Sequence, residues 1–398
     1  MSESEPRGFD LLAPTPEHTL LAGTLREFVA REVEPQAAAH DRDETFNLAL
    51  FRRAASLGLL GVTIGEEYGG AGLDATAAVQ VYEALSTSDP GFALAVLSHA
   101  VLFTQNVNVN GNELQKKHVL PRAVSGQWLG GLCMTEPEVG TDVLAMRTRA
   151  RRVGDVYVLD GTKTYITNGG SDEHTLGDAF VVYAATDERS LSSFLVEKGM
   201  PGFRLGQKWK DKLGMRASFT AELVFEGVRV PVENRLGAEG AGAIAMMRNL
   251  EIERLTLAAM SLGIAQRCLN VMIDWANSRK SFGVPIREHG QVQRYIAESF
   301  AEWRAARCLV YDTARRFDFT SAGQRIDADA AKLFASQAGK RAADAAIQVL
   351  GGYGYMGENV VERLWRDSKL LEIGGGTLEA HHKNLTRDLT RDPGRVRV

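Results

Sequence analysis

The hydrophobic periodicity changes twice along this chain, and the order of those changes constrains the fold more than any other feature. From about Thr15 to Gly126, apolar residues recur three and four positions apart, which predicts helices that each bury one face. From Met134 to about Pro231, alternating and β-branched runs bounded by Gly or Asp turns predict a small β domain. The helical period then returns and predicts amphipathic helices over residues 245–278, 291–317, 326–350 and 359–368.

The length of the chain agrees with such a division. At 398 residues it exceeds the usual size of one compact core, so two or three packed domains are expected. We place an N-terminal helical domain at residues 1–130, a middle β domain at 131–242 and a C-terminal helical bundle at 243–398. Four amphipathic helices in succession suggest that the last domain is a four-helix bundle.

Composition and charge exclude several classes of function. The chain is 44% hydrophobic and 24% charged, with a net charge of -4, so nothing indicates binding to nucleic acid or to an anionic membrane. The first residues, MSESEPRGFD, lack the apolar core of a secretory signal and the basic amphipathic pattern of a transit peptide, and no apolar run approaches a membrane span of ~20 residues. The three cysteines show no CxxC spacing, which argues against a zinc site and suits a reducing compartment. We therefore expect a cytoplasmic protein without a metal site.

A polar segment stands where the helical pattern gives way to the strand pattern, and it reads LCMTEPEVGTD over residues 132–142. Pro137 fixes the backbone locally, and Gly140 allows backbone N–H groups to approach a polar ligand closely. Thr135 and Thr141 add hydroxyl donors of adjustable direction. Taken alone, the segment fits a ligand-binding loop or a simple helix-to-strand turn.

Further motifs follow this segment in order along the chain. Together with Thr135-Glu136-Pro137, the ordered set consists of Glu67–Gly70 (EYGG), Gly161–Gly169 (GTKTYITNG), Lys212–Ser218 (KLGMRAS), Arg279 with Phe282-Gly283, Gln348 with Gly351-Gly352, and Gly374–Thr377 (GGGT). This set resembles the acyl-CoA dehydrogenase family of flavoproteins over nearly the whole chain. The resemblance implies the fold of that family, with an N-terminal helical domain, a β-barrel-like middle domain and a C-terminal four-helix bundle.

The resemblance also implies FAD as cofactor. Residues of the first segment would hold the isoalloxazine edge and the pyrophosphate, while Tyr165 would lie against the ring and Thr167 near the reactive nitrogen of the flavin. Alone, Tyr165 and Thr167 would be ordinary strand residues, because Tyr and Thr are good strand formers. The residues implied in this half of the cofactor site are Leu132, Met134, Thr135, Gly140, Thr141, Tyr165, Ile166 and Thr167.

In the family, the adenosine half of FAD is bound across a subunit interface, so the resemblance implies a homotetramer. The corresponding residues here are Arg279, Phe282, Gln348 and Gly352, with Thr377 and Glu379 along the same cofactor. Arg279 taken by itself would be a solvated cation near a helix C-terminus, where positive charge is favoured.

The reaction that the resemblance implies requires a base. Oxidation of an acyl thioester at its α and β carbons needs one group to take the α proton, and a carboxylate buried in an apolar pocket suits that task. Many family members carry this Glu in a Tyr-Glu-Gly-Thr loop, which reads Gly374-Gly375-Gly376-Thr377 here. Isovaleryl-CoA and long-chain acyl-CoA dehydrogenases instead place it on a bundle helix before an Arg, and this chain has Glu253-Arg254 at that position. We assign Glu253 as the base, although without the resemblance it would be one more solvated helix charge.

The glycine loop carries the expectation about substrate. By analogy, the backbone N–H of Gly375 and a ribose hydroxyl of the flavin polarise the thioester carbonyl. Gly374 stands where straight-chain enzymes often carry Tyr, and isovaleryl-CoA dehydrogenase also has Gly there, so we expect a short, branched acyl group. Both glycines would also suit a turn with no further role. Thr141 and Arg254 complete the implied substrate-binding residues.

Several positions depart from the family pattern. Tyr165 replaces the commoner Trp, Gly290 stands where a Gln usually contributes to the cofactor site, and residues 171–178 lengthen the loop after Thr167. His381-His382 is also unusual, but adjacent histidines do not share a helix face, so we do not expect a metal site.

We thus expect an FAD-dependent acyl-CoA dehydrogenase that passes electrons to electron-transfer flavoprotein, in the degradation of fatty acids or branched-chain amino acids. The alternatives are a medium- or long-chain acyl-CoA substrate, an acyl group on a carrier protein, and an oxidase or hydroxylase on the same fold. A flavin-containing binding protein that has lost its base is the non-enzymatic alternative.

Overall fold

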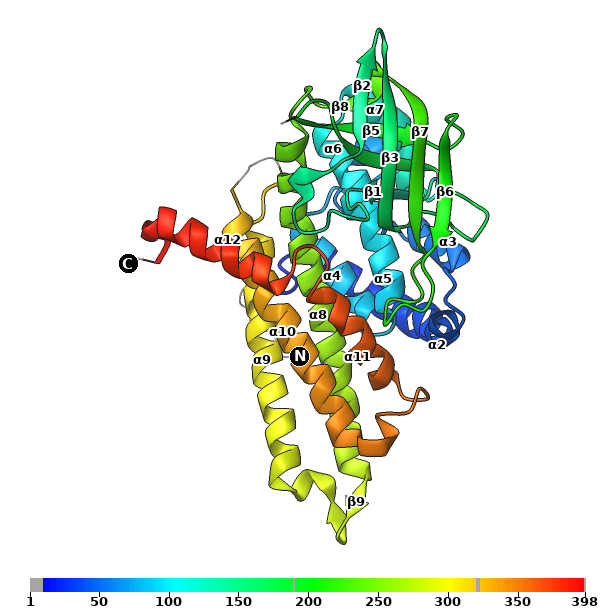
Figure 1. Ribbon diagram of the computed structural model, residues 1–398. Coiled ribbons are helices and arrows are strands. Elements are labelled where there is room, and N and C mark those ends of the chain that lie inside the picture. The colour runs from blue at the N-terminus through cyan, green and yellow to red at the C-terminus, as the bar shows by residue number, and fades with distance from the viewer. Residues whose placement is uncertain (1–9, 189, 320–322, 397–398) are drawn as a thin grey trace.

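The computed structural model describes residues 10–188, 190–319 and 323–396. The expectation that the chain begins without a signal or transit peptide rests mainly on residues 1–9, which lie outside the described part. Within that part the chain forms a helical region, a sheet and a second helical region, in that order (Figure 1).

The N-terminal region is a layer of helices whose starts are fixed by local capping. Asn47, Asp74 and Asp89 each accept a backbone N–H of the first turn that follows, and Asn112 forms a reciprocal capping box with Gln115. The helices are α1 (Pro16–Phe28), α2 (Glu34–Arg42), α3 (Leu48–Ser56), α4 (Ala75–Ser86), α5 (Pro90–Leu97), α6 (Gln105–Asn110) and α7 (Glu113–Val124), with π-helical turns at Val29–Val33 and Ser98–Thr104. Helices α4 and α5 are almost wholly buried, because α4 lies between α1 and the C-terminal helices and α5 packs against both α4 and the C-terminal helices.

The middle region is an 8-stranded sheet in the order β6-β7-β3-β2-β4-β5-β8, with β1 paired in parallel to β4. Its long central pair, β3 and β7, is antiparallel, and the register shifts between Lys163 and Ile166. The strands are β1 (Gly130–Cys133), β2 (Arg149–Val153), β3 (Val156–Thr167), β4 (Ala179–Ala185), β5 (Leu191–Glu197), β6 (Phe203–Lys208), β7 (Thr220–Pro231) and β8 (Arg235–Leu236).

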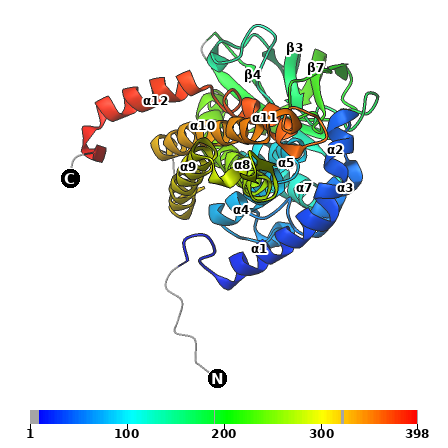
Figure 2. The ribbon, with the colours of Figure 1, turned by 90° about the horizontal axis from the view of Figure 1, so that it is seen from below.

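The C-terminal region is built around α8 (Gly242–Ser278), a helix of 37 residues and therefore about 55 Å long. It packs on α9 (Gly290–Arg315), α10 (Arg325–Leu350) and α11 (Val360–Leu371), and its other side contacts α4 (Figure 2). The short strands β9 (Lys280–Ser281) and β10 (Val284–Pro285) form a hairpin at the far end of the bundle. A further helix that periodicity did not predict, α12 (Leu378–Arg391), contacts α10 and projects from the bundle.

Within the described residues, two helical stretches are long and apolar enough to span a membrane, Pro90–Asn110 and α8, in contrast to the expectation that no apolar run approaches that length. In both, 72% of the most apolar window is buried inside the protein. Their hydrophobicity is therefore explained by the core, because a helix that is apolar all round is surrounded by other elements.

Candidate active site

Glu253 lies in the middle of α8 and is buried, with 8% of its surface exposed. Burial raises the pKa of this carboxyl from its ordinary value of 4.5 to about 7, while the neighbouring cations Arg254 and Lys332 act in the opposite direction. Its Oε2 atom has no hydrogen-bond partner among the described residues. The expectation from charge alone, a solvated helix residue, is wrong because α8 is enclosed at this level by other elements.

Glu251 occupies a different position, although it is only two residues away. It is also buried, but its Oε2 accepts a hydrogen bond of 3.3 Å from the backbone N–H of Gln324, at the start of α10. The buried carboxylate of Glu251 therefore has a hydrogen-bond donor at its Oε2, whereas Oε2 of Glu253 has none among the described residues.

The glycine loop between α11 and α12 lies against Glu253. Gly375 has φ +67°, and a Cβ atom built on it would lie 2.4 Å from Cδ1 of Leu257, so a side chain there would need Leu257 to move and would hold a strained backbone. The same Cβ position is 3.6 Å from Cδ and 3.7 Å from Oε1 of Glu253. Gly374 is less confined, because a Cβ there would meet Leu370 at ordinary contact distances of 3.4 Å and more.

Buried charges that the sequence reading had not selected surround Arg254. Its Nε donates to the carbonyl oxygen of Gly375 at 3.1 Å, and its Nη1 lies 2.8 Å from Oδ1 of Asp329 on α10. Lys332, one turn further along α10, is also buried and donates to the carbonyl oxygen of Leu371. Asp329 and Lys332 are three positions apart and therefore lie on one face of α10. This spacing of two charged residues is the sequence signal by which they could have been found.

The segment of residues 132–142 is fixed by one buried ion pair. Nζ of Lys163 lies 2.8 Å from Oε1 of Glu136 and donates to the carbonyl oxygen of Met134 at 3.1 Å. Glu136 also accepts the backbone N–H groups of Arg147 and Thr148. The conformation of the segment therefore depends on Glu136, which the sequence reading had treated only as part of a motif.

The predicted ligand residues of this segment differ in exposure. Leu132 is buried in β1, Met134 and Thr135 are half-buried, and Thr135 accepts the backbone N–H of Thr164 at 2.9 Å. Gly140 and Thr141 are exposed, and a Cβ on Gly140 would meet nothing within 4 Å. The far part of the segment thus presents backbone to open space.

Tyr165 has an unusual backbone conformation at the register shift of β3. Its φ is +56°, its side chain is 62% exposed, and its ring stacks obliquely on Trp209 with centroids 5.2 Å apart. A non-glycine residue in this region is strained, and such strain persists at functional sites. Ile166 is buried, and the carbonyl oxygen of Thr167 accepts the hydroxyl of Ser98 at 3.3 Å.

Within one chain, the residues predicted for the adenosine half of the cofactor do not lie together with Tyr165 and residues 132–142. The guanidinium of Arg279 lies over the rings of Trp275 and Tyr353, and Phe282 is 95% exposed with φ +50°. With Gln348 and Gly352, they lie toward the end of the bundle marked by β9, away from the sheet (Figure 1). Thr377 caps the N-terminus of α12 by accepting the N–H of Ala380, and Glu379 is exposed in the first turn.

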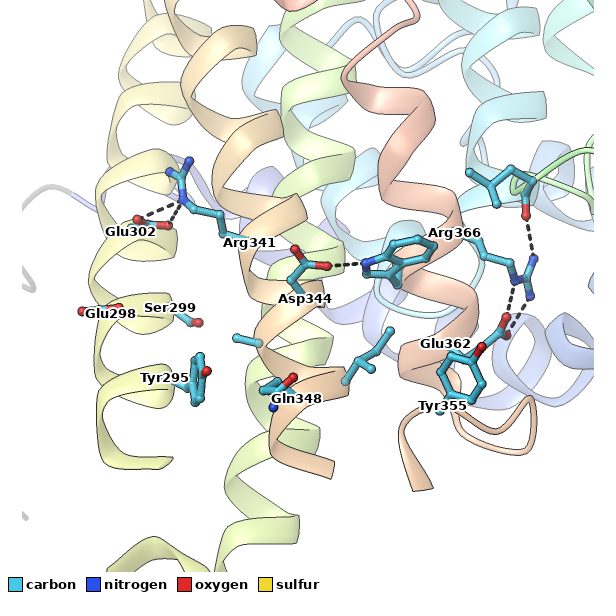
Figure 3. A pocket seen from close by; sticks show the side chains of 14 residues that line it. Tyr295, Glu298, Ser299, Glu302, Arg341, Asp344, Gln348, Tyr355, Glu362 and Arg366 are labelled. Atoms are coloured by element: carbon cyan, nitrogen blue, oxygen red, sulfur yellow. Dashed lines mark hydrogen bonds and ion pairs between the residues drawn. The ribbon is translucent and has the colours of Figure 1, made fainter. Parts of the chain in front are cut away.

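A cavity of about 920 Å³ opens between α9, α10 and α11 (Figure 3). Gln348 points into it together with Tyr295 and Tyr355, and an ion pair between Arg341 and Glu302 lies at one side. Glu253 is not among the lining residues. The cavity is therefore lined by Gln348, one of the residues predicted for the adenosine half of the cofactor, and not by the carboxylate of Glu253.

The insertion at residues 171–178 forms a closed loop between β3 and β4. Gly170 and Leu176 form an isolated bridge, and Glu173 lies 2.8 Å from Nζ of Lys210 in the connection between β6 and β7. The ion pair joins the insertion to the segment that also carries Trp209. The ring of Trp209 in that segment contacts the exposed ring of Tyr165, so the loop of residues 171–178 is linked to the surroundings of Tyr165.

The sequence matches three domains of one family. It matches the N-terminal domain of acyl-CoA dehydrogenases over residues 15–127, the middle domain over 131–228 and the C-terminal domain over 240–390. The mitochondrial isovaleryl-CoA dehydrogenase of Oryza sativa subsp. japonica is 38% identical over 93% of this chain and 90% of that protein. The short-chain specific acyl-CoA dehydrogenase of Clostridium acetobutylicum is likewise 38% identical, over 92% of this chain and 96% of that protein.

Solved structures agree with these matches. Butyryl-CoA dehydrogenase from Megasphaera elsdenii has a TM-score of 0.90 at 32% identity, covering 98% of this chain and 100% of that chain. An acyl-CoA dehydrogenase complexed with FAD from Bacillus anthracis has a TM-score of 0.88 at 32% identity, covering 96% of this chain and 68% of that chain. A structure from work on the electron transferring flavoprotein of Acidaminococcus fermentans has a TM-score of 0.91 at 34% identity, covering 95% of this chain and 99% of that chain.

Proposed function

We propose that Glu253 is the catalytic base of this chain, which belongs to the acyl-CoA dehydrogenase family. As a member of that family, the chain is an oxidoreductase acting on CH–CH bonds. The reaction converts an acyl-CoA to the trans-2-enoyl-CoA, and Glu253 removes the α proton of the substrate. One observation carries the assignment. The carboxyl of Glu253 lies beside the position at which a side chain on Gly375 would begin. Many family members carry Glu at this loop position. The loop position and the carboxyl of Glu253 on the helix therefore lie next to each other.

The surroundings of Glu253 suit proton abstraction. A base is most effective when its pKa lies near the working pH, and burial raises the pKa of Glu253 to about 7. Its unpartnered Oε2 is free to accept the proton. The Gly375 N–H would donate to the thioester carbonyl, which stabilises the negative charge that develops when the α proton leaves.

The described residues fit FAD. Members of this family bind FAD, and this chain offers an exposed Tyr165 ring next to a segment whose Gly140 backbone faces open space. An isoalloxazine ring stacks favourably on an aromatic face, and a pyrophosphate binds well to accessible backbone N–H groups. FAD supplies the acceptor for the β hydrogen, which leaves as a hydride. Leu132, Met134, Thr135, Thr141, Ile166 and Thr167 would complete this half of its site.

The adenosine half supports an assembly of several subunits. Arg279 and Phe282 border the short strands β9 and β10 at the far end of the bundle, and Gln348 and Gly352 lie at the end of α10, whereas Tyr165 belongs to β3 of the sheet (Figure 1). We propose that a second copy supplies them, as in a homotetramer, with Thr377 and Glu379 along the same cofactor. Electron-transfer flavoprotein is the proposed acceptor, and the similar structure from work on such a flavoprotein supports this choice.

The proposed substrate is a short, branched acyl-CoA of the isovaleryl type. Gly374 has no side chain to fill the space near the loop, which a branched β carbon requires. The isovaleryl-CoA and short-chain specific relatives are equally similar to this chain, so the preference rests on Gly374. We place the protein in the cytoplasm.

The test is anaerobic mixing of the purified protein with straight and branched short acyl-CoA esters, followed by the flavin absorbance. Fast bleaching by isovaleryl-CoA, and slower bleaching by butyryl-CoA, is expected. Equal rates would contradict the branched preference, and no bleaching by any CoA ester would contradict free acyl-CoA as substrate. Oxygen uptake during turnover would identify an oxidase instead.

A further inference from the structure

Behind the glycine loop, three buried ionisable side chains from three helices meet. Arg254 comes from α8, Asp329 from α10 and His381 from α12, and the last two have no exposed surface. Oδ1 of Asp329 lies 2.8 Å from Nη1 of Arg254 and 3.0 Å from Nδ1 of His381. One carboxylate oxygen thus joins the guanidinium to the imidazole.

The contact with Asp329 determines how the histidine ring is used. Because Asp329 is an acceptor, Nδ1 of His381 carries the hydrogen, and Nε2 is left without a hydrogen-bond partner among the described residues. The ring then lies against the loop, since a Cβ on Gly376 would be 3.2 Å from Cε1 and 3.4 Å from Nε2. His381 therefore packs against the glycine loop while it donates to Asp329.

The same network controls where Arg254 points. Its Nε is bonded to the carbonyl oxygen of Gly375 and its Nη1 is paired with Asp329, whereas Oε2 of Glu253 has no hydrogen-bond partner among the described residues. A buried guanidinium that lost Asp329 would need another anion, because an unpaired buried charge is costly. The carboxylate of Glu253, on which Arg254 already acts electrostatically, is the neighbouring anion on α8 that could take this place.

We propose that Asp329 and His381 are positioning residues that hold Arg254 on the Gly375 carbonyl and thereby keep the Glu253 carboxylate unpaired. This inference rests on the proposed role of Glu253 as base. The charged groups that act on Glu253 are Arg254 and Lys332, and those that act on His381 are Asp329, Lys332 and Arg254. Asp329 thus acts on the reaction through Arg254, without touching the substrate.

The decisive variant is Asp329→Asn in the FAD-loaded protein. Arg254 should then pair with Glu253, so the apparent pKa of flavin reduction should fall from about 7 toward 4.5, and the limiting rate should fall by about tenfold. The matched control is Asp327→Asn on the same helix, because Asp327 is half-exposed and pairs with Arg395 at the surface. This control should keep the wild-type rate and pH profile.

A second readout does not depend on turnover. Acetoacetyl-CoA has acidic α protons but no hydrogen to lose as hydride from its β carbon, so it can be enolised without being oxidised. Its dissociation constant should rise by about tenfold in Asp329→Asn, since an Arg-paired Glu253 accepts the proton less readily. Asp327→Asn should bind it as the wild type does.

His381 variants keep the proposal testable if Asp329→Asn does not fold. In His381→Asn, the amide N–H can still donate to Asp329 from the position of Nδ1, so this variant should retain the wild-type pH profile. His381→Leu cannot donate, and its apparent pKa should fall as in Asp329→Asn. Glu253→Gln is measured in the same series. If Glu253→Gln is inactive while Asp329→Asn and His381→Leu behave as the wild type, the positioning role is refuted and the base assignment stands. If Glu253→Gln reduces its flavin at the wild-type rate, the base assignment itself is wrong.

Discussion

The carboxyl carbon of Glu253 lies 3.6 Å from the point where a Cβ atom on Gly375 would begin. Helix α8 and the loop after α11 thus bring the carboxylate of Glu253 and the backbone of Gly375 to the same place. A base and a donor for the carbonyl are the two groups that α-proton abstraction from a thioester requires. In the proposed mechanism, Glu253 on the helix supplies the carboxylate that the loop lacks.

Replacing this carboxylate gives the most direct prediction. Glu253→Gln should slow flavin reduction by roughly 10²-fold or more, because an amide cannot accept the α proton, while FAD remains bound. Stopped-flow absorbance measures the rate. Glu251→Gln is the control, since its Oε1 can still accept from the backbone of Gln324. Equal losses in the two variants would rule out a specific role for Glu253.

The raised pKa of Glu253 predicts the pH dependence of the reaction. Only the carboxylate accepts a proton, so the rate of flavin reduction should increase with pH and level off above about 7. A profile that is flat between pH 5.5 and 8.5, about one and a half pH units on each side, would contradict burial as the determinant of this pKa.

The same shift predicts an effect on stability. Between pH 4.5, the ordinary pKa, and about 7, the folded protein holds a proton on Glu253 that the unfolded chain has released. The contribution of this group to stability therefore falls as pH rises through that window. The unfolding temperature of Glu253→Gln relative to that of the wild type should therefore rise from pH 5 to about pH 8. Calorimetry at several pH values measures this difference. A constant difference would contradict the shift.

The substrate preference is tested by restoring a ring at the loop. Gly374→Tyr should disfavour isovaleryl-CoA more than butyryl-CoA, because the ring would occupy space that a branched β carbon needs. The Cβ position at Gly374 has only ordinary contacts with Leu370, so the variant should fold. The ratio of the two kcat/KM values is the measurement, and an unchanged ratio would refute the pocket argument.

A side chain at Gly375 should be destabilising. In Gly375→Ala the new Cβ would collide with Leu257, and the residue would have to hold φ +67°, so a loss of about 1–3 kcal/mol in stability is expected. Urea denaturation measures it. Gly23→Ala is the control, because Gly23 lies within α1 with nothing within 4 Å of its Cβ position, and alanine should stabilise that helix by about 0.5–1 kcal/mol.

The ion pair under residues 132–142 should support both stability and cofactor affinity. Lys163→Met leaves Glu136 buried without its cation, so a loss of about 3 kcal/mol or more and a weaker affinity for FAD are expected. The control is Lys198→Met, whose partner Asp178 lies 3.8 Å away at the surface, and its cost should stay within about 1 kcal/mol. Similar losses in the two variants would show that burial of the first pair is unimportant.

The sequence by itself determined the order of the three regions, because helix and strand periodicities are local properties of neighbouring residues. The ordered motifs identified the family and selected Glu253-Arg254 on its helix. The strands β3, β4 and β7 and the helices α8 to α11 were predictable for the same reason, whereas α12 was not, since its first turns are poor in apolar residues.

Only the tertiary structure decided the chemistry of the candidate base. Arg254 and Gly375 are 121 positions apart, and no local pattern shows that they bond or that Asp329 and His381 lie behind them. The burial of Glu253, its free Oε2 and its raised pKa follow from packing between helices distant in sequence. Desolvation is a property of all the elements around a group, so the residue could be chosen from sequence while its pKa could not.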